Sequence, residues 1–547
     1  MSLERVLYAI WLILIIGFAA LHLVNLRADF PNGSPWMEDG AKYTDEGYYG
    51  NAAIREVLTG HWQVPGDFTP APAAPLWPVL EWVLFSFTGV SVESARTLVV
   101  LVFLSSLVTT HFLLRKQGPT WMVLLALTVL VTSPYLYCYS RLATLEPLLT
   151  SLTLASIALA VKLPRLRHPL WGSAGLGLLC TMLMLTKPTA IFVLPALLCA
   201  CLQPSWEDRK FALRKALIAV GAFGVSFGLW MTFIVGLGLY PQYKYLYEMN
   251  KYPKVGSLWV LRALLDTFRA GLKIDTILVP LAILVILLVL VSGRLISARL
   301  LWSNTVLISS ALVVAGYISF ITFQNHPAFR YFPVLVVFLL LLLVQTTEIL
   351  LRQDGWLRQM GTAALALIGV AVCFNAFRTV NYAIHPQYSF VNAAENLTHY
   401  IDANPNGNRL LVSSSSNDIT LITHLPALCD PFGPQDLGSK LALYQPGWFA
   451  TWNYIEPSTL GAIHRSFTLE QVASFHAFDR EQRNLLVLFK LHPLSADESK
   501  AVAMMQPTLP FPQDRIEIPI NAPESIHDSV THQFTNLLRG YFHRIVR

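Results

Sequence analysis

Charged residues are scarce in this sequence of 547 residues. Asp, Glu, Lys and Arg together make up 13% of it, about half the ~25% that is usual in soluble domains. Hydrophobic residues make up 54%, which excludes a soluble globular enzyme. Apolar runs of about 20 residues recur along the chain, and each is long enough to cross the hydrocarbon core of a bilayer. The composition predicts a polytopic α-helical membrane protein.

Sequence motifs for metal binding and disulfides are also missing. The six cysteines form neither a disulfide framework nor a CxxC pair. No HExxH sequence occurs and the histidines are scattered, so zinc is not predicted. The net charge of +6 is uneven, because residues 381–547 carry 11 basic and 15 acidic residues while the preceding part is net +10. In so apolar a chain this excess indicates membrane orientation and not nucleic-acid binding.

About eleven apolar segments are expected to cross the membrane. They are residues 6–25, 96–114, 119–138, 143–161, 170–186, 189–204, 212–237, 274–292, 301–323, 331–350 and 360–380. With the N-terminus in the cytoplasm, the positive-inside rule is satisfied by five short basic loops. These loops carry Arg115 and Lys116, Lys162 to Arg167, Arg209 to Lys215, Arg294 to Arg299, and Arg352 to Arg358.

The sequence changes character near residue 381. Residues 1–380 are expected to form a transmembrane domain with a large first outer loop, 26–95, and a basic outer loop, 238–273. Residues 381–547 mix polar and apolar positions with many turn residues, and their length suits one outward-facing soluble domain. Helical spacing at 391–403, followed by apolar runs at 409–412 and 484–489, predicts that this domain is α/β.

Loop 238–273 contains six basic residues interleaved with five tyrosines. One interpretation is a solvated loop with an aromatic belt at the level of the lipid headgroups. The other is a site that receives an anionic headgroup such as a lipid phosphate.

Four carboxylates lie within nine residues of the first outer loop: Glu38, Asp39, Asp45 and Glu46. They follow the first transmembrane segment and stand among aromatic residues. Such groups at the membrane surface can serve as a general base or as metal ligands. An acidic loop that is merely solvated is the alternative that composition alone favours.

The sequence from Asp45 onward resembles the first outer loop of GT-C-class glycosyltransferases of the protein O-mannosyltransferase type, and the bacterial aminoarabinose lipid A transferases are similar in the same places. The resemblance rests on the order and spacing of several short motifs. They are Asp45-Glu46-Gly47-Tyr48-Tyr49, Leu58-Thr59-Gly60-His61-Trp62, Pro75-Leu76, Ser140-Arg141 to Glu146, Leu185-Thr186-Lys187-Pro188 and Arg330-Tyr331. It covers most of residues 1–380 and fades in the tail.

The resemblance implies an enzyme that takes a sugar from a polyprenyl-phosphate donor and passes it, usually with inversion, to a lipid, glycan or protein acceptor on the non-cytoplasmic side. It implies that Asp45 is catalytic, with Glu46 beside it, and that Tyr48 and Tyr49 contact substrate. One departure concerns Ala73-Ala74-Pro75-Leu76. Relatives commonly have Lys-Pro-Pro-Leu there, so a Lys contact to donor or acceptor is missing.

Further ionisable residues match the family at membrane depth, where such groups are costly. Arg141 and Glu146 are expected either to contact substrate or to have a structural role. The structural role is an ion pair between them or an Arg141 that extends to the surface by snorkelling. Lys187 is expected either to bind a phosphate or to extend to the surface by snorkelling. For Arg330, followed by Tyr331, we favour binding of the donor phosphate, because Arg binds phosphate through two parallel hydrogen bonds.

The sequence leaves some alternatives open. No metal cofactor is established, although Asp45 and Glu46 are suited to hold a divalent cation. A lipid or solute transporter would be favoured by midplane charges and inverted repeats, neither of which is apparent. A non-catalytic scaffold that binds lipid-linked sugar shares every feature except turnover. The bacterial relatives favour a bacterial inner membrane over the endoplasmic reticulum.

Overall fold

The computed structural model describes residues 3–249, 256, 259–294, 298–324, 327–429, 433–478, 483–494 and 516–517. The chain divides into two compact units. The first comprises residues 1–45 and 70–386, and the second comprises residues 46–69 and 387–547. The expected boundary at residue 381 falls inside a helix, α17 (Trp356–Ile384), which carries the chain to the start of the second unit.

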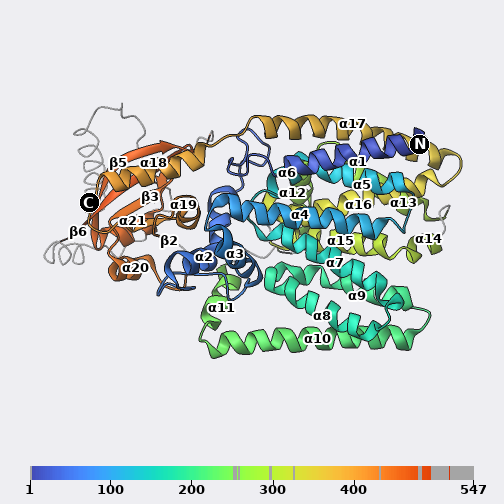
Figure 1. Cartoon of the computed structure of the whole chain (residues 1–547), viewed down its shortest axis with the longest axis horizontal. Coiled ribbons are helices and arrows are strands. Elements are labelled where there is room, and N and C mark those ends of the chain that lie inside the picture. Colours follow the sequence, from blue (N-terminus) through green and yellow to red (C-terminus); the bar gives the residue numbers. More distant parts are fainter. Residues whose placement is uncertain are drawn as a thin grey trace. The chain divides into compact units, whose positions relative to one another are not determined.

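The first unit is helical, and its long helices run roughly parallel to one another (Figure 1). Its apolar helices are α1 (Leu3–Leu21), α4 (Val92–Leu114), α5 (Thr120–Val131), α7 (Leu145–Lys162), α8 (Pro169–Thr186), α9 (Leu194–Leu202), α10 (Arg209–Gly236), α13 (Leu278–Val291), α15 (Thr305–Gln324), α16 (Phe332–Leu351) and α17. Among the described residues, eight helices are long and apolar enough to cross a membrane. The chain is therefore an integral membrane protein, as the composition predicts.

Each of the eleven expected spans coincides with one of these helices. Three of the helices, α5, α9 and α13, are shorter than a full span, so the number of crossings stays a prediction. Short linking elements, α6 (Pro134–Tyr139), η1 (Leu163–Arg165), η2 (Pro188–Phe192), η3 (Gln203–Ser205), η5 (Ser292–Arg294) and α14 (Ala298–Ser303), complete this part of the chain.

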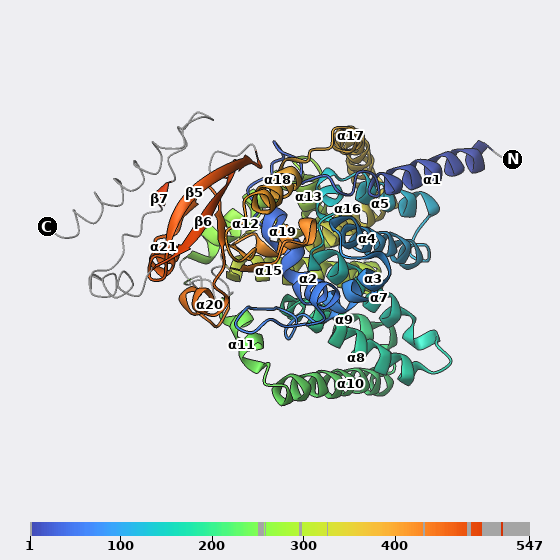
Figure 2. The ribbon, with the colours of Figure 1, turned by 60° about the vertical axis from the view of Figure 1, so that its left-hand side comes forward.

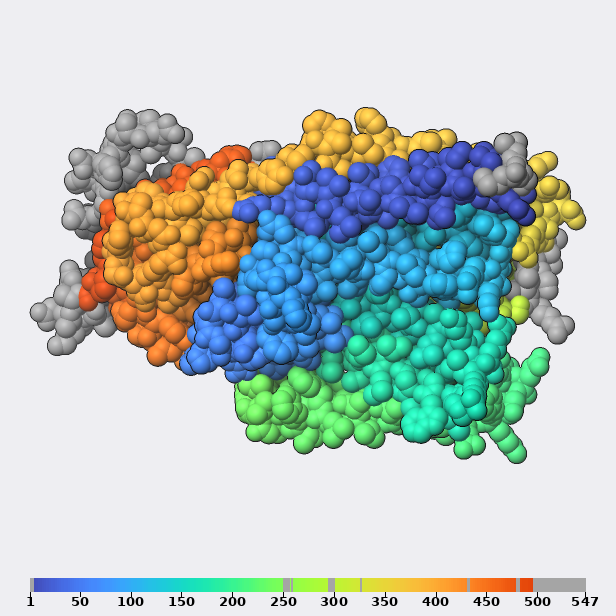
Figure 3. Space-filling model, viewed as in Figure 1, coloured from blue at the N-terminus to red at the C-terminus, as the bar shows by residue number. Residues whose placement is uncertain are grey.

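The position of each helix in the unit follows its sequence. Helix α16 is apolar on all sides and almost entirely buried. A helix that is apolar all round needs protein neighbours or lipid on every side. It packs against α5, α7, α13, α15 and α17. Helices α1 and α10 instead expose large apolar side chains, among them Ile13 and Leu229, and α1 lies on the surface of the unit (Figure 3). These exposed apolar faces are suited to lipid.

The two expected outer loops are partly helical. Segment 26–95 contains α2 (Ala41–Thr59) and α3 (Leu76–Thr88), and segment 238–273 contains α11 (Tyr240–Met249) and most of α12 (Val260–Ile274). The basic residues Lys251 and Lys254 lie outside the described residues.

The second unit contains a five-stranded mixed sheet with the order β2-β1-β3-β6-β5. Its strands are β1 (Leu411–Ser413), β2 (Ala427–Cys429), β3 (Trp448–Thr451), β5 (Phe467–His476) and β6 (Leu485–Pro493). Strand β1 pairs in parallel with β2 and β3, whereas β6 pairs antiparallel with β3 and β5; the long β5–β6 pair is seen in Figure 2. A separate short pair joins β4 (Tyr454–Ile455) to β7 (Ile516–Glu517).

Helices α18 (Ser389–Ala403), α19 (Ser416–Thr423), α20 (Leu437–Tyr444) and α21 (Pro457–His464) complete the second unit. Helix α18 and the strands β1 and β6 occur where the sequence predicts a helix at 391–403 and strands at 409–412 and 484–489. The α/β prediction for this region is therefore confirmed within its described residues.

Residues 46–69, although distant in sequence, belong to the second unit. The carboxylate of Asp418 in α19 accepts a hydrogen bond from the backbone N–H of Gly47. Gly47 approaches α19 so closely that a Cβ atom added there would lie 2.1 Å from the carbonyl oxygen of Asn417. Asp67 forms buried salt bridges with Arg55 and, at 3.3 Å, with Lys440 of α20. Early and late segments therefore share one packed structure.

Candidate functional site

Arg330 is the centre of a charged cluster in the first unit. It lies in a short 3-10 helix, η6 (Phe329–Tyr331), directly before α16, whose second residue is Pro333. Proline fits the first turn of a helix, where its missing N–H has no partner to lose. The Nη1 atom of Arg330 lies 3.0 Å from Oδ1 of Asp39, and its Nε atom lies 3.4 Å from Oδ2 of Asp45. One guanidinium thus contacts two carboxylates from the first outer segment.

Asp39 binds several partners at once. Its carboxylate accepts hydrogen bonds from the hydroxyl of Tyr139 at 3.1 Å, from the backbone N–H of Ala41 at 3.0 Å and from the backbone N–H of Arg330. The side chain is only 3% exposed. An Asp placed just before a helix satisfies N–H groups of its first turn that have no partner inside the helix. Asp39 therefore joins the start of α2 to the start of α16.

Asp45 lies one turn into α2. Besides Arg330, its carboxylate accepts a hydrogen bond of 2.9 Å from the hydroxyl of Thr44. The side chain is 12% exposed, more than that of Asp39. Asp45 is therefore held in place by two partners and remains partly accessible.

Two tyrosines of α6 form hydrogen bonds with the residues around Arg330. Tyr135 donates a hydrogen bond of 2.6 Å to the carbonyl of Phe329, and Tyr139 binds Asp39. These tyrosines are four residues apart, so they lie on the same face of the helix, and both are buried. Tyr135 thus holds the backbone directly before Arg330, and Tyr139 holds the carboxylate that binds Arg330.

Lys187 and Glu146 form a buried ion pair. Glu146 lies at the start of α7, and Lys187 follows the end of α8. The Nζ atom of Lys187 also lies 4.8 Å from the centre of the Tyr331 ring. The expected residues Lys187, Glu146, Arg330 and Tyr331 are therefore brought together at one end of the helical bundle.

Arg141 has different surroundings. It donates hydrogen bonds to the carbonyls of Val24, at 2.7 Å, and Asn25, which follow α1, and to the hydroxyl of Tyr137. Of the two structural interpretations, an ion pair between Arg141 and Glu146 is not the arrangement found, because Glu146 is paired with Lys187. Arg141 instead anchors the chain that leaves α1.

The remaining expected residues belong to the second unit. Glu46 is buried. Tyr48 and Tyr49 pack edge to face, with ring centres 5.1 Å apart, and Tyr48 also packs against Phe68. Tyr48 is buried, whereas Tyr49 is partly exposed.

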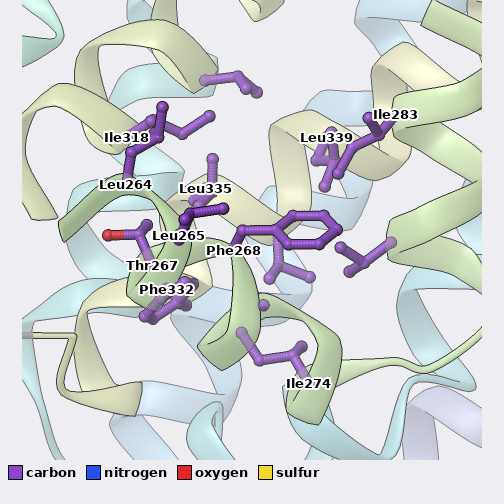
Figure 4. A pocket seen from close by; sticks show the side chains of 14 residues that line it. Leu264, Leu265, Thr267, Phe268, Ile274, Ile283, Ile318, Phe332, Leu335 and Leu339 are labelled. Carbon is purple, nitrogen blue, oxygen red and sulfur yellow. The ribbon is translucent and has the colours of Figure 1, made fainter. Parts of the chain in front are cut away.

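An apolar groove of about 370 Å³ opens between α12, α13, α15 and α16 of the first unit. Thr267 is the single polar side chain among its lining residues. Figure 4 shows Leu265 and Phe268 of α12 in the same cavity as Leu335 and Leu339 of α16. Phe332 also lines it, so the groove begins two residues from Arg330.

No group of three or more His, Cys, Asp or Glu side chains suited to a metal ion occurs in the described part of the chain. Asp39 and Asp45 both contact the guanidinium of Arg330, which lies between them.

The sequence assigned roles to Arg330 and Asp45. It gave Asp39 only as one of four clustered carboxylates, and it gave no role to Tyr135 or Tyr139. A signal for Asp39 was present, since Asp-Gly-Ala before a helix is a typical N-terminal pattern. Tyr135 and Tyr139 belong with Tyr137 to a row of tyrosines at alternate positions in an apolar run. That pattern is typical of an ordinary buried segment. Their contacts depend on residues distant in sequence.

The helical bundle and its charged end define an integral membrane protein with a polar site at one end of the spans. No family model matches the sequence, and no curated protein matches it. The fold is similar to the crystal structure of ArnT, the aminoarabinose lipid A transferase, from Cupriavidus metallidurans bound to undecaprenyl phosphate. The two sequences are 14% identical, the match covers 88% of this chain and 98% of that chain, and the TM-score is 0.53. The apo form of ArnT gives 13% identity and a TM-score of 0.54 over the same shares.

A second similar structure is the archaeal oligosaccharyltransferase AglB from Archaeoglobus fulgidus, in complex with an inhibitory peptide and a dolichol-phosphate. It has 10% identity and a TM-score of 0.50, with 86% of this chain and 73% of that chain covered. Both neighbours are GT-C glycosyltransferases. The resemblance drawn from the motifs and the expected fold class are confirmed at the level of the fold.

Proposed function

We propose that this chain is a membrane glycosyltransferase that transfers a sugar from a polyprenyl-phosphate donor to an acceptor on the non-cytoplasmic face. The observation that carries the proposal is the position of Arg330. It contacts Asp45, which matches the catalytic acid of the GT-C family, and it lies two residues before Phe332, which lines the apolar groove. A polyprenyl-phosphate donor requires a cation for its phosphate and an apolar groove for its chain. The transfer to an acceptor requires a base.

The donor is expected to bind with its phosphate at Arg330 and its prenyl chain in the groove. Arginine carries five N–H donors, so one guanidinium can hold both a carboxylate and a phosphate. The groove offers almost no polar partner, which suits a hydrocarbon chain. Undecaprenyl phosphate and dolichol-phosphate in the two structural neighbours support this class of donor.

Asp45 is proposed as the general base. It takes the proton from the acceptor's hydroxyl or amine while that atom attacks the anomeric carbon, and the bond from that carbon to the phosphate oxygen breaks. Polyprenyl phosphate leaves with the electron pair of this bond, and a single displacement inverts the anomeric configuration. Arg330 stabilises the negative charge that grows on the leaving phosphate.

Other residues have supporting roles in this proposal. Lys187, held by Glu146 beside Tyr331, adds a second cation near the donor phosphate. Glu46, Tyr48 and Tyr49 are proposed to contact the substrates, and Arg141 to hold the adjoining backbone. A divalent cation at Asp45 and Glu46 remains a prediction.

We also propose the membrane orientation that the basic loops imply, with the N-terminus in the cytoplasm and residues 387–547 outside. A bacterial inner membrane is the favoured location, because the ArnT neighbour comes from a bacterium.

The experiment that tests the function is an assay of the purified protein with a panel of radiolabelled polyprenyl-phosphate sugars and lipid, glycan and peptide acceptors. Transfer of label to an acceptor with loss of one donor is expected. Saturable donor binding without any transfer would indicate a sugar-lipid-binding scaffold instead. Absence of donor binding would contradict the proposal as a whole.

A further inference from the structure

Helix α12 has three different faces. Its packed face is built from small and apolar residues and lies against α13 and α15; it consists of Ala263, Thr267, Ala270, Gly271 and Ile274. At 3.6 residues per turn, the other side chains fall into two further faces. The apolar face is exposed and consists of Leu261, Leu264, Leu265 and Phe268. The charged face consists of Arg262, Asp266, Arg269 and Lys273.

The apolar face of α12 is suited to lipid and not to water. Leu261 is 67% exposed and Leu265 is 47% exposed. The helix has 15 residues, fewer than the ~20 needed to cross a bilayer, and four charged residues along one side would be costly inside the hydrocarbon. A short helix with one exposed apolar face and one charged face is typical of helices that lie in the plane of the membrane surface.

The C-terminal end of α12 lies at the charged end of the helical bundle. The indole N–H of Trp36 donates a hydrogen bond of 2.9 Å to the carbonyl of Lys273. The ring of Trp36 packs edge to face on Tyr135, with ring centres 5.4 Å apart, and Tyr135 binds the carbonyl of Phe329. Phe329 precedes Arg330. Helix α12 therefore lies at the level of the polar site, where a membrane surface is expected, and not at the middle of the spans.

The charged face carries three cations and one carboxylate, a net charge of +2. Asp266 is paired with Arg269, whose Nη1 atom lies 3.1 Å from its Oδ1 atom. Arg262 lies over the ring of Trp259, at 5.6 Å from the ring centre, and Lys273 is exposed. Among the described residues, neither Arg262 nor Lys273 has a carboxylate partner. Two cations on this face are therefore available to an anion.

Asp275, the next carboxylate in the sequence, is engaged elsewhere. Its Oδ1 atom accepts the backbone N–H groups of Ile277, at 2.9 Å, and Leu278, at 2.6 Å. Its Oδ2 atom accepts a hydrogen bond of 2.6 Å from the side chain of Asn375 in α17. Asp275 thus holds the start of α13 and does not neutralise the charged face.

A hollow of about 310 Å³ lies beside Arg262 on this face. It is lined by Trp259, Arg262, Ala263 and Asp266. Because Arg269 balances the charge of Asp266, the remaining charge in the hollow is that of Arg262. Tryptophan is enriched at the level of lipid headgroups, and the volume is of the order of small-ligand sites, about 300–1,000 Å³.

We propose that α12 lies in the membrane surface and binds anionic phospholipids there, with their acyl chains against the apolar face and their headgroups at Arg262 and Lys273. Long basic side chains reach headgroups in this way while their stems stay in apolar surroundings. Each cation near an anionic bilayer surface contributes about 1 kcal/mol, a factor of about five in affinity. The proposal requires an integral membrane protein and does not rest on the proposed function.

The test is photo-cross-linking of the full chain in liposomes of phosphatidylglycerol and phosphatidylcholine, without sugar donor or acceptor. Two trace probes carry the same diazirine acyl chain on one or the other headgroup, and mass spectrometry locates the cross-linked peptides. At the apolar face of α12 we expect at least fivefold more cross-linking by the phosphatidylglycerol probe. Around the exposed Leu229 of α10, an apolar surface, the two probes should react about equally.

The variant that tests the charged face is Arg262→Gln combined with Lys273→Gln. It is expected to bring the ratio of the two cross-links at α12 close to one. The matched control is Arg115→Gln with Lys116→Gln, because both residues are exposed and Arg115 likewise lies over an aromatic ring, that of Phe112, at 4.5 Å. This control should leave the ratio at α12 unchanged. In the wild-type chain, about 1 M salt, which shortens the screening length to about 3 Å, should also lower the ratio.

Absence of cross-links from either probe to α12 would remove the helix from the membrane surface and overturn the proposal. Equal cross-linking by the two probes in the wild-type chain, or equal loss of the preference in the two double variants, would also overturn it. Displacement of the phosphatidylglycerol probe by trace undecaprenyl phosphate would assign the charged face to the donor instead. None of these results depends on sugar transfer, so failure of the proposed function leaves them unaffected.

Discussion

The Nε atom of Arg330 lies 3.4 Å from Oδ2 of Asp45. The residue proposed to hold the donor phosphate therefore touches the residue proposed to accept the acceptor's proton. This contact couples donor binding to proton transfer, because a change at either residue alters the charge that the other one faces. Variants at these positions must be compared through both kcat and the donor KM.

Asp45→Asn is expected to reduce turnover by about 10²–10⁴-fold, the usual contribution of a positioned base. The amide keeps the shape of the carboxylate but cannot take the proton. Donor binding should persist, so kcat falls while the donor dissociation constant does not rise. Glu46→Gln should have a milder effect if Glu46 only orients Asp45 or holds an ion.

The control for Asp45→Asn is Glu38→Gln, which removes the same charge from an exposed position in the same segment. Asp39→Asn would not serve as a control, because Asp39 binds Arg330. Near wild-type turnover in Asp45→Asn would remove Asp45 from the mechanism, and equal losses in all variants would point to the charge of the segment.

Arg330→Ala is expected to raise the donor KM more than Arg330→Lys does. Lysine keeps a point charge but loses the planar fork, and a hydrogen bond to a charged group contributes about 1.5–3 kcal/mol. The measurement is initial rate against donor concentration in both variants. Arg27→Ala is the control, since Arg27 forms an exposed ion pair with Glu93. An unchanged donor dependence would make Arg330 a structural anchor only.

Asp39→Asn is expected to lower stability and weaken donor binding together. The amide can no longer accept every hydrogen bond that the buried carboxylate accepts, and each one lost from a buried group costs about 1–3 kcal/mol. Thermal unfolding of the purified protein and a donor titration measure the two effects. A loss of turnover with unchanged stability and unchanged donor binding would instead identify Asp39 as the base.

Lys187→Met and Glu146→Gln test whether the buried ion pair is structural. Removing one partner of such a pair typically costs about 3–5 kcal/mol, because the other charge is left buried. The double variant should therefore lose less stability than the two single variants added together, as a double-mutant cycle would measure. If Lys187 also binds the donor, Lys187→Met raises the donor KM and Glu146→Gln does so much less.

Topology can be tested without changing the site. A reporter fused after Arg547 and another inserted after the exposed Gly60 should both report the outer compartment, and one placed at Arg209 should report the cytoplasm. These outcomes follow from the short basic loops. A cytoplasmic C-terminus would reverse the proposed orientation.

The helices of the first unit were predictable because bilayer thickness and the need to satisfy backbone hydrogen bonds leave the sequence few options. The apolar run at 331–350 predicts α16 almost to the residue. Helix α2 was not predicted, since its residues are polar on average and its first half carries the charges of the cluster. Its formation depends on partners elsewhere in the chain.

The site was predictable residue by residue but not as an arrangement. Arg330 and Asp45 were both recognised from their motifs, yet their contact joins positions 285 residues apart, and that with Asp39 spans 291. Lys187 and Glu146 were each given a role, but their pairing with one another was not foreseen. Only the packing of α7, α8 and α16 determines which charges meet.

The second unit is assembled from two stretches of chain, and this affects its synthesis. Residues 46–69 are made before residues 387–494, which supply the five-stranded sheet, and 317 residues of the first unit lie between them in the sequence. At about 5–20 residues per second, the first stretch waits roughly 15–65 s for its partners. During that interval Gly47 lacks Asp418 and Asp67 lacks Lys440, so a factor that shields nascent chains outside the membrane would act on this segment first.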